Sequence, residues 1–264
     1  MGNELTGGIG EGMTAVLLQA GGAALLCLAV MGICRKAAVR VGRETAVSLL
    51  RGFLQIALVG VLLVLVLHRG FAVGVLLLLA MAAAAAVTAS RRAGGIPGAM
   101  RICFVAVAAG SGITITAMAF LGAVTAELAT LVPVGSMVIA SAMNSASQAA
   151  ERFRAEVAAQ AGLVEAALAL GASPAAAVSA QTRNAVYASL IPRLDSLKSL
   201  GIVWIPGMMA GMIVSGANPV FAGIYQFIVM AMIYAASGIT ALFTAVLLRT
   251  RVFTPAEQLA LRRP

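Results

Sequence analysis

Apolar runs of about the length that crosses a bilayer recur along the sequence, and they restrict its fold more than any other feature. Residues 54–67 (LQIALVGVLLVLVL) and 71–87 (FAVGVLLLLAMAAAAAV) place apolar residues on every face of a helix, unlike the alternating pattern of transmembrane β-strands. A soluble domain cannot bury a chain that is 61% hydrophobic and only 10% charged. The sequence therefore predicts an all-α fold, a polytopic transmembrane helical bundle.

Hydropathy, with glycine, proline and charge as boundaries, predicts seven spans. They cover residues 13–34, 45–67, 70–90, 101–121, 127–149, 201–216 and 219–248. The N-terminal segment has no basic stretch, so we expect no cleaved signal peptide. The length fits a single membrane domain over residues 1–264, with a helical hairpin at about 151–200 outside the bilayer.

The lysines and arginines predict the orientation of these spans in a bacterial inner (plasma) membrane. An N-terminus outside the cell leaves only Arg69 facing outward. The cytoplasmic side then receives Arg35, Lys36, Arg40, Arg43, Arg91, Arg92, Arg101, Arg152, Arg154, Arg183, Arg193, Lys198, Arg249, Arg251, Arg262 and Arg263. The net charge of +9 is therefore a topology signal that places the C-terminus inside. Because the charges are spread over several loops, we expect no nucleic-acid partner.

The sequence lacks the motifs of an enzyme. No GxxxxGK[ST], HExxH or GxSxG is present, and Cys27, Cys34, Cys103 and His68 form no metal-ligand pattern. We expect no catalytic residue and no cofactor bound by this chain. The apolar runs also carry almost no carboxylates of the kind that relay protons in secondary carriers, and Arg51 is close enough to a surface to snorkel. We therefore expect another chain to supply the energy.

A polar segment at residues 165–201 interrupts the apolar pattern. Val157, Ala161, Val164 and Leu168 form an apolar stripe that predicts an amphipathic helix ending at Gly171. Ser173 and Pro174 predict an N-cap and the first position of a second helix, which runs to about Leu190. The resulting hairpin either inserts its corner into a partner's cleft or is a solvated connector.

Residues 165–171 (EAALALG) resemble the opening of the EAA-x3-G signature by which permeases of ABC importers dock on their ATPase. The continuation resembles the FetB-type ABC permease family, iron exporters related to the plant aluminium-sensitivity permease. The resemblance rests on Leu170-Gly171-Ala172, Arg183, Ile191-Pro192, Asp195-Ser196, Lys198, Gly201, Pro206-Gly207-Met208-Met209, Gly211, Gly216, Pro219 and Tyr225-Gln226. Upstream, Arg51, Gln55, Pro133, Met137 and Ala142-Met143 agree, whereas Ser141 and Asn218 depart from the family pattern.

The resemblance implies a permease subunit that exports iron, another metal or a metal chelate. ATP and Mg²⁺ then bind a separate ATPase subunit, and two permease copies pair with two ATPase copies. An ABC permease for a sugar nucleotide, a secondary carrier or channel not coupled to ATP, and a membrane scaffold without transport activity are the alternatives.

Two groups of candidate site residues follow. Coupling to the ATPase is assigned to Glu165, Gly171, Ala172, Ser173, Pro174, Arg183, Asp195 and Lys198. A translocation path or gate is assigned to Arg51, Gln55, Met137, Ser141, Met143, Pro206, Gly207, Met208, Met209 and Met212. The methionines either fill packing gaps or face the substrate, although thioethers suit soft metals better than iron(III). Gly207 and Gly211 are expected at a close helix contact beside the break at Pro206.

Overall fold

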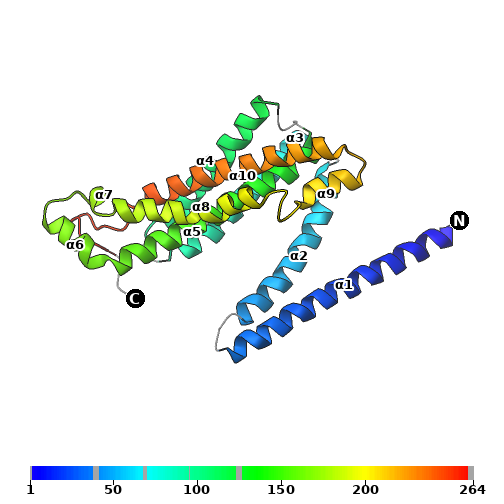
Figure 1. The fold of residues 1–264 in the computed structure, drawn as a ribbon, viewed down its shortest axis with the longest axis horizontal. Coiled ribbons are helices and arrows are strands. Elements are labelled where there is room, and N and C mark those ends of the chain that lie inside the picture. Colours follow the sequence, from blue (N-terminus) through cyan, green and yellow to red (C-terminus); the bar gives the residue numbers. More distant parts are fainter. Residues whose placement is uncertain (1, 38–41, 68–69, 95, 123–126, 261–264) are drawn as a thin grey trace. The chain divides into compact units, whose positions relative to one another are not determined.

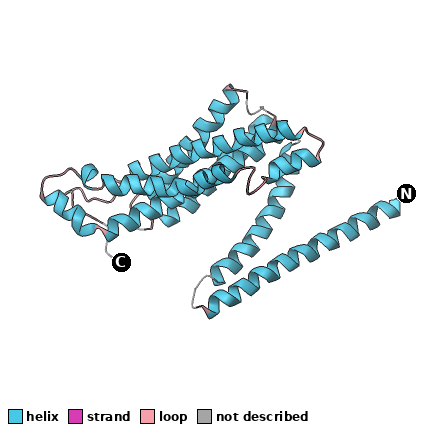
Figure 2. Ribbon diagram, viewed as in Figure 1, coloured by secondary structure: helices cyan, strands magenta, loops and turns pink. Residues whose placement is uncertain are grey.

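The computed structural model describes residues 2–37, 42–67, 70–94, 96–122 and 127–260 of the chain, and within these ranges it consists of helices and turns without a β-strand (Figures 1 and 2). The helices are α1 (Gly2–Lys36), α2 (Gly42–Leu67), α3 (Phe71–Arg92), α4 (Ala99–Phe120), α5 (Leu128–Ala159), α6 (Ala161–Ala169), α7 (Pro174–Ala177), α8 (Ser179–Ser199), α9 (Gly207–Val214) and α10 (Pro219–Leu248). The predicted all-α fold is confirmed. Of the residues used for the orientation, Arg40, Arg69, Arg262 and Arg263 lie outside the described ranges, as does His68.

The chain divides into two compact units, of which the first ends at His68 and contains α1 and α2. Both helices are apolar along most of their length and contact one another. An open apolar groove of about 650 Å³ lies between them. Its lining is rich in small residues: Ala20, Gly21, Ala23, Ala24, Cys27, Ser48, Leu49, Leu50, Gly52 and Phe53.

The second unit, from Arg69 onward, is a bundle in which α3, α4, α5 and α10 pack against one another and α8 lies along α5 and α10 (Figure 1). A central cluster fills its interior. Its buried members are Leu78, Ala82, Ala85, Ala89, Cys103, Val107, Leu131, Val134, Val138, Ile139, Ala142, Ala146, Val229, Met230, Met232, Ile233 and Ala236. The many alanines let the helices approach closely, as small residues do at membrane helix contacts.

A second cluster, the end cluster, closes the bundle where α6 and α7 lie. It consists of Ala93, Ile96, Ala99, Ile102, Ala150, Phe153, Val157, Val164, Val178, Ala185, Leu248 and Val252. The cluster joins the last turns of α5 and α10 to α6 and α8, and the Gln181 amide donates a hydrogen bond to the Gln160 side chain at 2.8 Å. The short helices at this end therefore share one core with the long ones.

Among the residues that the structure describes, five helices are long and apolar enough to cross a membrane. Their apolar segments, Leu18–Lys36, Glu44–Leu63, Phe71–Arg92, Ala99–Phe120 and Pro219–Leu248, coincide with five of the predicted spans. The predicted span at 127–149 lies within α5, whose 32 residues extend about 48 Å at 1.5 Å per residue. Within the predicted hairpin at about 151–200, α6 and α7 lie on either side of residues 170–173.

The predicted sixth span at 201–216 does not form one helix. Residues 200–206 are a turn in which Gly201 has φ +77° and donates its N–H to the Trp204 carbonyl at 3.1 Å. α9 has only eight residues, about 12 Å, against a hydrocarbon core of about 30 Å. The helix that was expected to end near Leu190 instead continues to Ser199 as α8. The segment antiparallel to α10 is therefore discontinuous, with α8 and α9 separated by the turn.

Candidate functional site

The corner, defined here as residues Gly171–Pro174, is closed by a Schellman motif at the end of α6. Gly171 has φ +87°, which favours glycine, and its N–H donates to the Leu168 carbonyl at 3.0 Å. The Ala172 N–H donates to the Ala167 carbonyl, also at 3.0 Å. Both bonds satisfy carbonyls that a free helix end would leave without partners. The prediction of Gly171 as the C′ residue is confirmed.

The other side of the corner is capped by Ser173. Its hydroxyl accepts a hydrogen bond from the Ala176 N–H at 3.4 Å, and Pro174 occupies the first turn of α7, as the sequence predicted. α7 ends at Ala177, and the chain continues after Val178 as α8. The two caps fix the direction of the chain through the corner within a few residues.

The same combination of a C-terminal glycine and a following N-cap forms a second corner, between α9 and α10. Gly216 has φ +93°, the Ala217 N–H donates to the Met212 carbonyl at 2.9 Å, and Asn218 Oδ1 accepts from the Val220 N–H at 2.8 Å. The letters Gly-Ala-Asn-Pro at 216–219 repeat the pattern Gly-Ala-Ser-Pro at 171–174. The predicted spans end at residue 216 and resume at 219, which matches this break, although the repeated capping motif was not recognised from the sequence.

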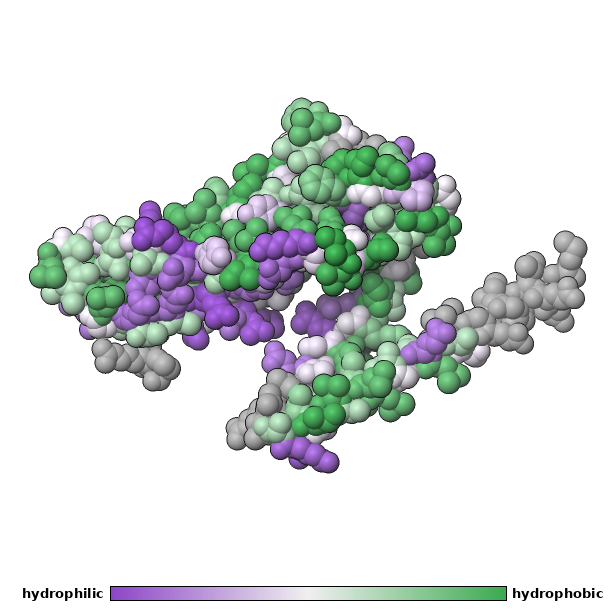
Figure 3. All heavy atoms as spheres, viewed as in Figure 1, coloured by the Kyte–Doolittle hydropathy of each residue, from purple (hydrophilic) through white to green (hydrophobic). Residues whose placement is uncertain are grey.

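Exposed apolar side chains lie next to the first corner. Leu170 is 89% exposed and Leu163 is 66% exposed, whereas Val164 of the same helix is buried in the end cluster. Hydrophilic side chains gather on the α5 and α8 part of the bundle (Figure 3). Glu165 on α6 and Arg183 on α8 are exposed. An exposed apolar tip flanked by polar residues is typical of a docking surface.

Asp195 and Lys198 do not belong to this tip. They form an ion pair at 3.8 Å near the far end of α8, with side chains 65% and 75% exposed. Asp195 lies 16 residues after Ser179, the first residue of α8, which is about 24 Å along the helix. Arg193, two residues before Asp195, is half-buried, and burial lowers the pKa of its guanidinium from the ordinary value. The predicted coupling residues therefore occupy two separate places.

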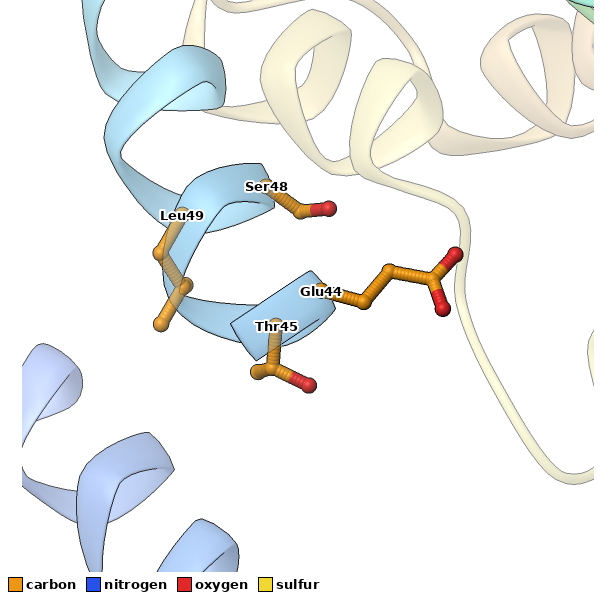
Figure 4. A pocket seen from close by; sticks show the side chains of 4 residues that line it. All are labelled: Glu44, Thr45, Ser48 and Leu49. Carbon is orange, nitrogen blue, oxygen red and sulfur yellow. The ribbon is translucent and has the colours of Figure 1, made fainter. Parts of the chain in front are cut away.

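In the first unit, Arg51 and Gln55 lie on α2 and are exposed. With Glu44 and Ser48 they follow spacings of four, three and four, so the four residues share one face of the helix. Figure 4 shows that Glu44 and Ser48 point to the same side, into a pocket of about 370 Å³. Of this polar face, only Arg51 and Gln55 were selected from the sequence.

The path candidates of α5 and α9 are mainly packing residues. Ser141 is buried and Met143 packs on the central cluster, whereas Met137 is 38% exposed. Met208, Met209 and Met212 are half-buried on α9, which packs on α10. Met208 contacts the central cluster, and the Met209 methyl lies 3.7 Å from the position that a Cβ on Gly223 would occupy. Met208 and Met209 therefore fill packing gaps, which is one of the two interpretations offered for these methionines.

The expectation for the glycines of the sixth segment is wrong. A Cβ on Gly207 or Gly211 would meet no atom within 4 Å, so neither marks a close helix contact in the described chain. Pro206 is buried and precedes the first turn of α9 instead of interrupting a helix. It starts a helix here, because a proline lacks the N–H that the first turn leaves unused.

A row of buried hydroxyls on α10 was missed from the sequence. Ser237, Thr240 and Thr244 are fully buried, and their hydroxyl oxygens have no hydrogen-bond partner in the structure. Ser145 of α5 shares this property. The available signal was the spacing of three and four between hydroxyl residues inside an otherwise apolar span. Such groups form hydrogen bonds with an oxygen-bearing solute or with water.

Among the described residues, His, Cys, Asp and Glu side chains form no group of three or more that could hold a metal ion.

Comparison with known proteins decides the family. Residues 17–253 match the model of an uncharacterised protein family, UPF0014. The chain belongs to this family. UPF0014 membrane protein STAR2 of Oryza sativa subsp. japonica is 33% identical over 217 residues, which cover 82% of this chain and 76% of the relative. Protein ALUMINUM SENSITIVE 3 of Arabidopsis thaliana is 32% identical over 217 residues, 82% of this chain and 80% of the relative.

A bacterial relative is named for its transport role. The probable iron export permease protein FetB of Escherichia coli (strain K12) is 27% identical over 238 residues, 90% of this chain and 92% of the relative. No solved structure matches the chain. With its apolar helices and these relatives, the chain is a multi-pass UPF0014 membrane protein with a probable iron export permease among its relatives.

Proposed function

We propose that this UPF0014 protein is the membrane-spanning subunit of an ABC transporter that exports iron, another metal or a metal chelate. The name of the FetB relative supports the transport of a metal. The chain has no GxxxxGK[ST] motif, so ATP and Mg²⁺ bind a separate ATPase subunit. The protein acts in the bacterial inner membrane and is not itself an enzyme.

The corner Gly171–Pro174 carries this proposal. It is fixed by caps on both sides, it is built from small residues, and Leu170 and Leu163 give it an exposed apolar surface. A rigid tip of this kind fits a cleft in a partner, because little conformational entropy is lost when it docks. Its supporting helices share the end cluster with α5 and α10, so movement of the tip is transmitted to helices of the bundle.

A second copy of the chain completes the transporter. One chain provides one such corner, whereas two ATPase subunits offer two clefts related by symmetry. A twofold dimer of permeases engages both clefts in the same way. The assembly then contains two permease and two ATPase copies.

Copurification of the full-length chain with its candidate ATPase tests the proposal, with Gly171→Arg as the variant. The arginine adds bulk at the tip and strains a residue at φ +87°, so we expect loss of copurification and of solute-stimulated ATP hydrolysis. Gly162→Arg is the matched control, because Gly162 is exposed on α6, lacks a positive φ and has open space around it. This control should bind and couple normally.

Two outcomes oppose the proposal. If Gly171→Arg binds and couples as the wild type does, the corner is only a connector between α6 and α8. If liposomes of this chain alone move a solute in response to an ion gradient, the protein is a secondary carrier or channel that needs no ATPase.

A further inference from the structure

One face of α10 carries a continuous buried stripe, named here the α10 stripe. Its members recur at spacings of four, three, four, three and four: Gln226, Met230, Ile233, Ser237, Thr240 and Thr244. All six side chains are at most 7% exposed. The 19 residues from Gln226 to Thr244 extend over about 27 Å, close to the thickness of the hydrocarbon core of about 30 Å. The stripe thus runs along nearly the whole membrane-crossing part of the helix.

The polar atoms of the α10 stripe lack partners in the structure. This is true of the hydroxyls of Ser237, Thr240 and Thr244 and of Gln226 Oε1. Other hydroxyls of the bundle bond to their own helix: Ser111 donates to the Val107 carbonyl at 2.6 Å and Thr114 to the Gly110 carbonyl at 2.8 Å. The same local bond is the usual one for a helical serine or threonine. The hydroxyls of the stripe therefore differ from those of α4.

Buried polar groups without partners destabilise a helix bundle, since they have lost water and gained no hydrogen bond. The α10 stripe places three such hydroxyls on one buried face, and the amide of Gln226 lies on the same face. Packing alone does not explain this arrangement. Residues that oppose stability in this way are typical of sites where a ligand or another conformation supplies the missing partner. The stripe thus indicates a function that this closed conformation does not reveal.

Few charged residues lie near the stripe, and one of them, Arg249 with its buried Nε, follows the end of α10. α10 contains no Asp, Glu, Lys, Arg or His, α4 has none after Arg101, and α5 has none before Glu151. α8, which also packs on α10, holds Arg193 half-buried and Asp195 and Lys198 exposed. Transfer of a bare multivalent cation into such surroundings is strongly unfavourable. Hydroxyl and amide groups instead suit a solute that presents hydroxyl or carbonyl oxygens.

Met230 and Ile233 divide the stripe into two polar ends. Gln226 lies on one side, and Ser237, Thr240 and Thr244 lie on the other. Both apolar side chains belong to the central cluster. A short hydrophobic constriction between polar segments excludes water and polar solutes when it is closed.

We propose that the α10 stripe is one wall of a closed transport path for an uncharged, oxygen-rich solute, with Met230 and Ile233 as its hydrophobic plug. The inference rests on the transport function proposed above and specifies its substrate class. A metal crosses only inside a charge-neutral complex that presents oxygen atoms to the stripe.

The first arm of the experiment measures the Tm of the full chain in detergent. Thr240→Val and Thr244→Val keep the side-chain shape and remove a hydroxyl without a partner, so Tm should stay unchanged or rise by about 2–4 °C. Thr114→Val is the matched control, because it removes a hydroxyl that is bonded and its Tm should fall. If the stripe variants lose as much stability as this control, their hydroxyls are structural and the proposal is wrong.

The second arm measures leakage through liposomes that contain the chain alone. Ile233→Thr, or Met230→Gln as a second variant of similar volume, extends the polar stripe through the plug. We expect ribitol flux to rise by about tenfold, as a barrier lower by about 1.4 kcal/mol produces, without a matching rise for sodium ions. Val229→Thr adds the same hydroxyl at a buried position off the stripe and should leave the vesicles tight.

No ribitol flux above wild type in either variant, equal leakage of sodium ions, or equal leakage through Val229→Thr would each overturn the proposal. Neither arm contains an ATPase, so the results do not depend on the docking of the corner. Conversely, Gly171→Arg tests the docking of the corner without altering the stripe.

Discussion

At the scale of single residues, the glycines of this protein have different functions that the letter alone does not distinguish. Gly171 and Gly201 adopt positive φ, whereas Gly110 is required for a close approach of two helices. The sequence identified Gly171 because a helix stripe ended there and an N-cap followed. It misassigned Gly207, since a local pattern does not show which neighbour a helix face meets.

Gly110→Ala should destabilise the bundle by about 1–3 kcal/mol through overpacking. The added Cβ would overlap the Thr240 hydroxyl and lie 2.8 Å from the Ala236 carbonyl oxygen. The hydroxyl is able to rotate away, but the backbone carbonyl is not. Gly112→Ala is the matched control, because a Cβ there meets no atom within 4 Å. Thermal unfolding in detergent measures both, and equal Tm values would contradict the close contact of α4 and α10.

At the scale of elements, hydropathy located the helices that are apolar throughout and failed at the segment that follows α8. Residues 201–216 are apolar enough for a span, but a window average does not register that Gly201 turns the chain and Pro206 starts a new helix. The helix that became α8 was also predicted to end too early, near Leu190. In the structure, α8 continues through Pro192 while it packs on α5 and α10.

Gly201→Ala should loosen the turn between α8 and α9. A non-glycine residue in the left-handed region costs about 1–2 kcal/mol, and the Gly201 N–H holds the Trp204 carbonyl at 3.1 Å. Trp204 is the single tryptophan of the chain and is 41% exposed, so acrylamide quenching reports on this turn directly. We expect stronger quenching in Gly201→Ala and no change in Gly207→Ala, whose surroundings are open. Identical quenching in both would show that the turn does not need its glycine.

At the scale of the whole molecule, the long apolar helices were predictable because each carries its own signal. The packing of the bundle was not predictable in the same way. The end cluster joins α4, α5, α6, α8 and the end of α10 with the chain after α3 and after α10, and no local pattern predicts that such distant segments share a core. The spacing of the hydroxyls on α10 was readable in the sequence, but their burial without partners became visible only once their neighbours were known. The orientation in the membrane remains a prediction from the charge distribution.

Labelling of single cysteines tests that orientation. In a background without Cys27, Cys34 and Cys103, a cysteine at Gly2 should react with an impermeant thiol reagent added to intact cells, because the lysines and arginines place this end outside. A cysteine at Arg262, outside the described residues, should react only after the cells are opened. The helices by themselves do not determine whether the two termini lie on opposite sides of the membrane. That depends on whether α8, the turn at residues 200–206 and α9 together cross the membrane. Equal labelling of both termini in intact cells would place them on the same side, and the corner at Gly171–Pro174 would then have to be assigned to a side afresh.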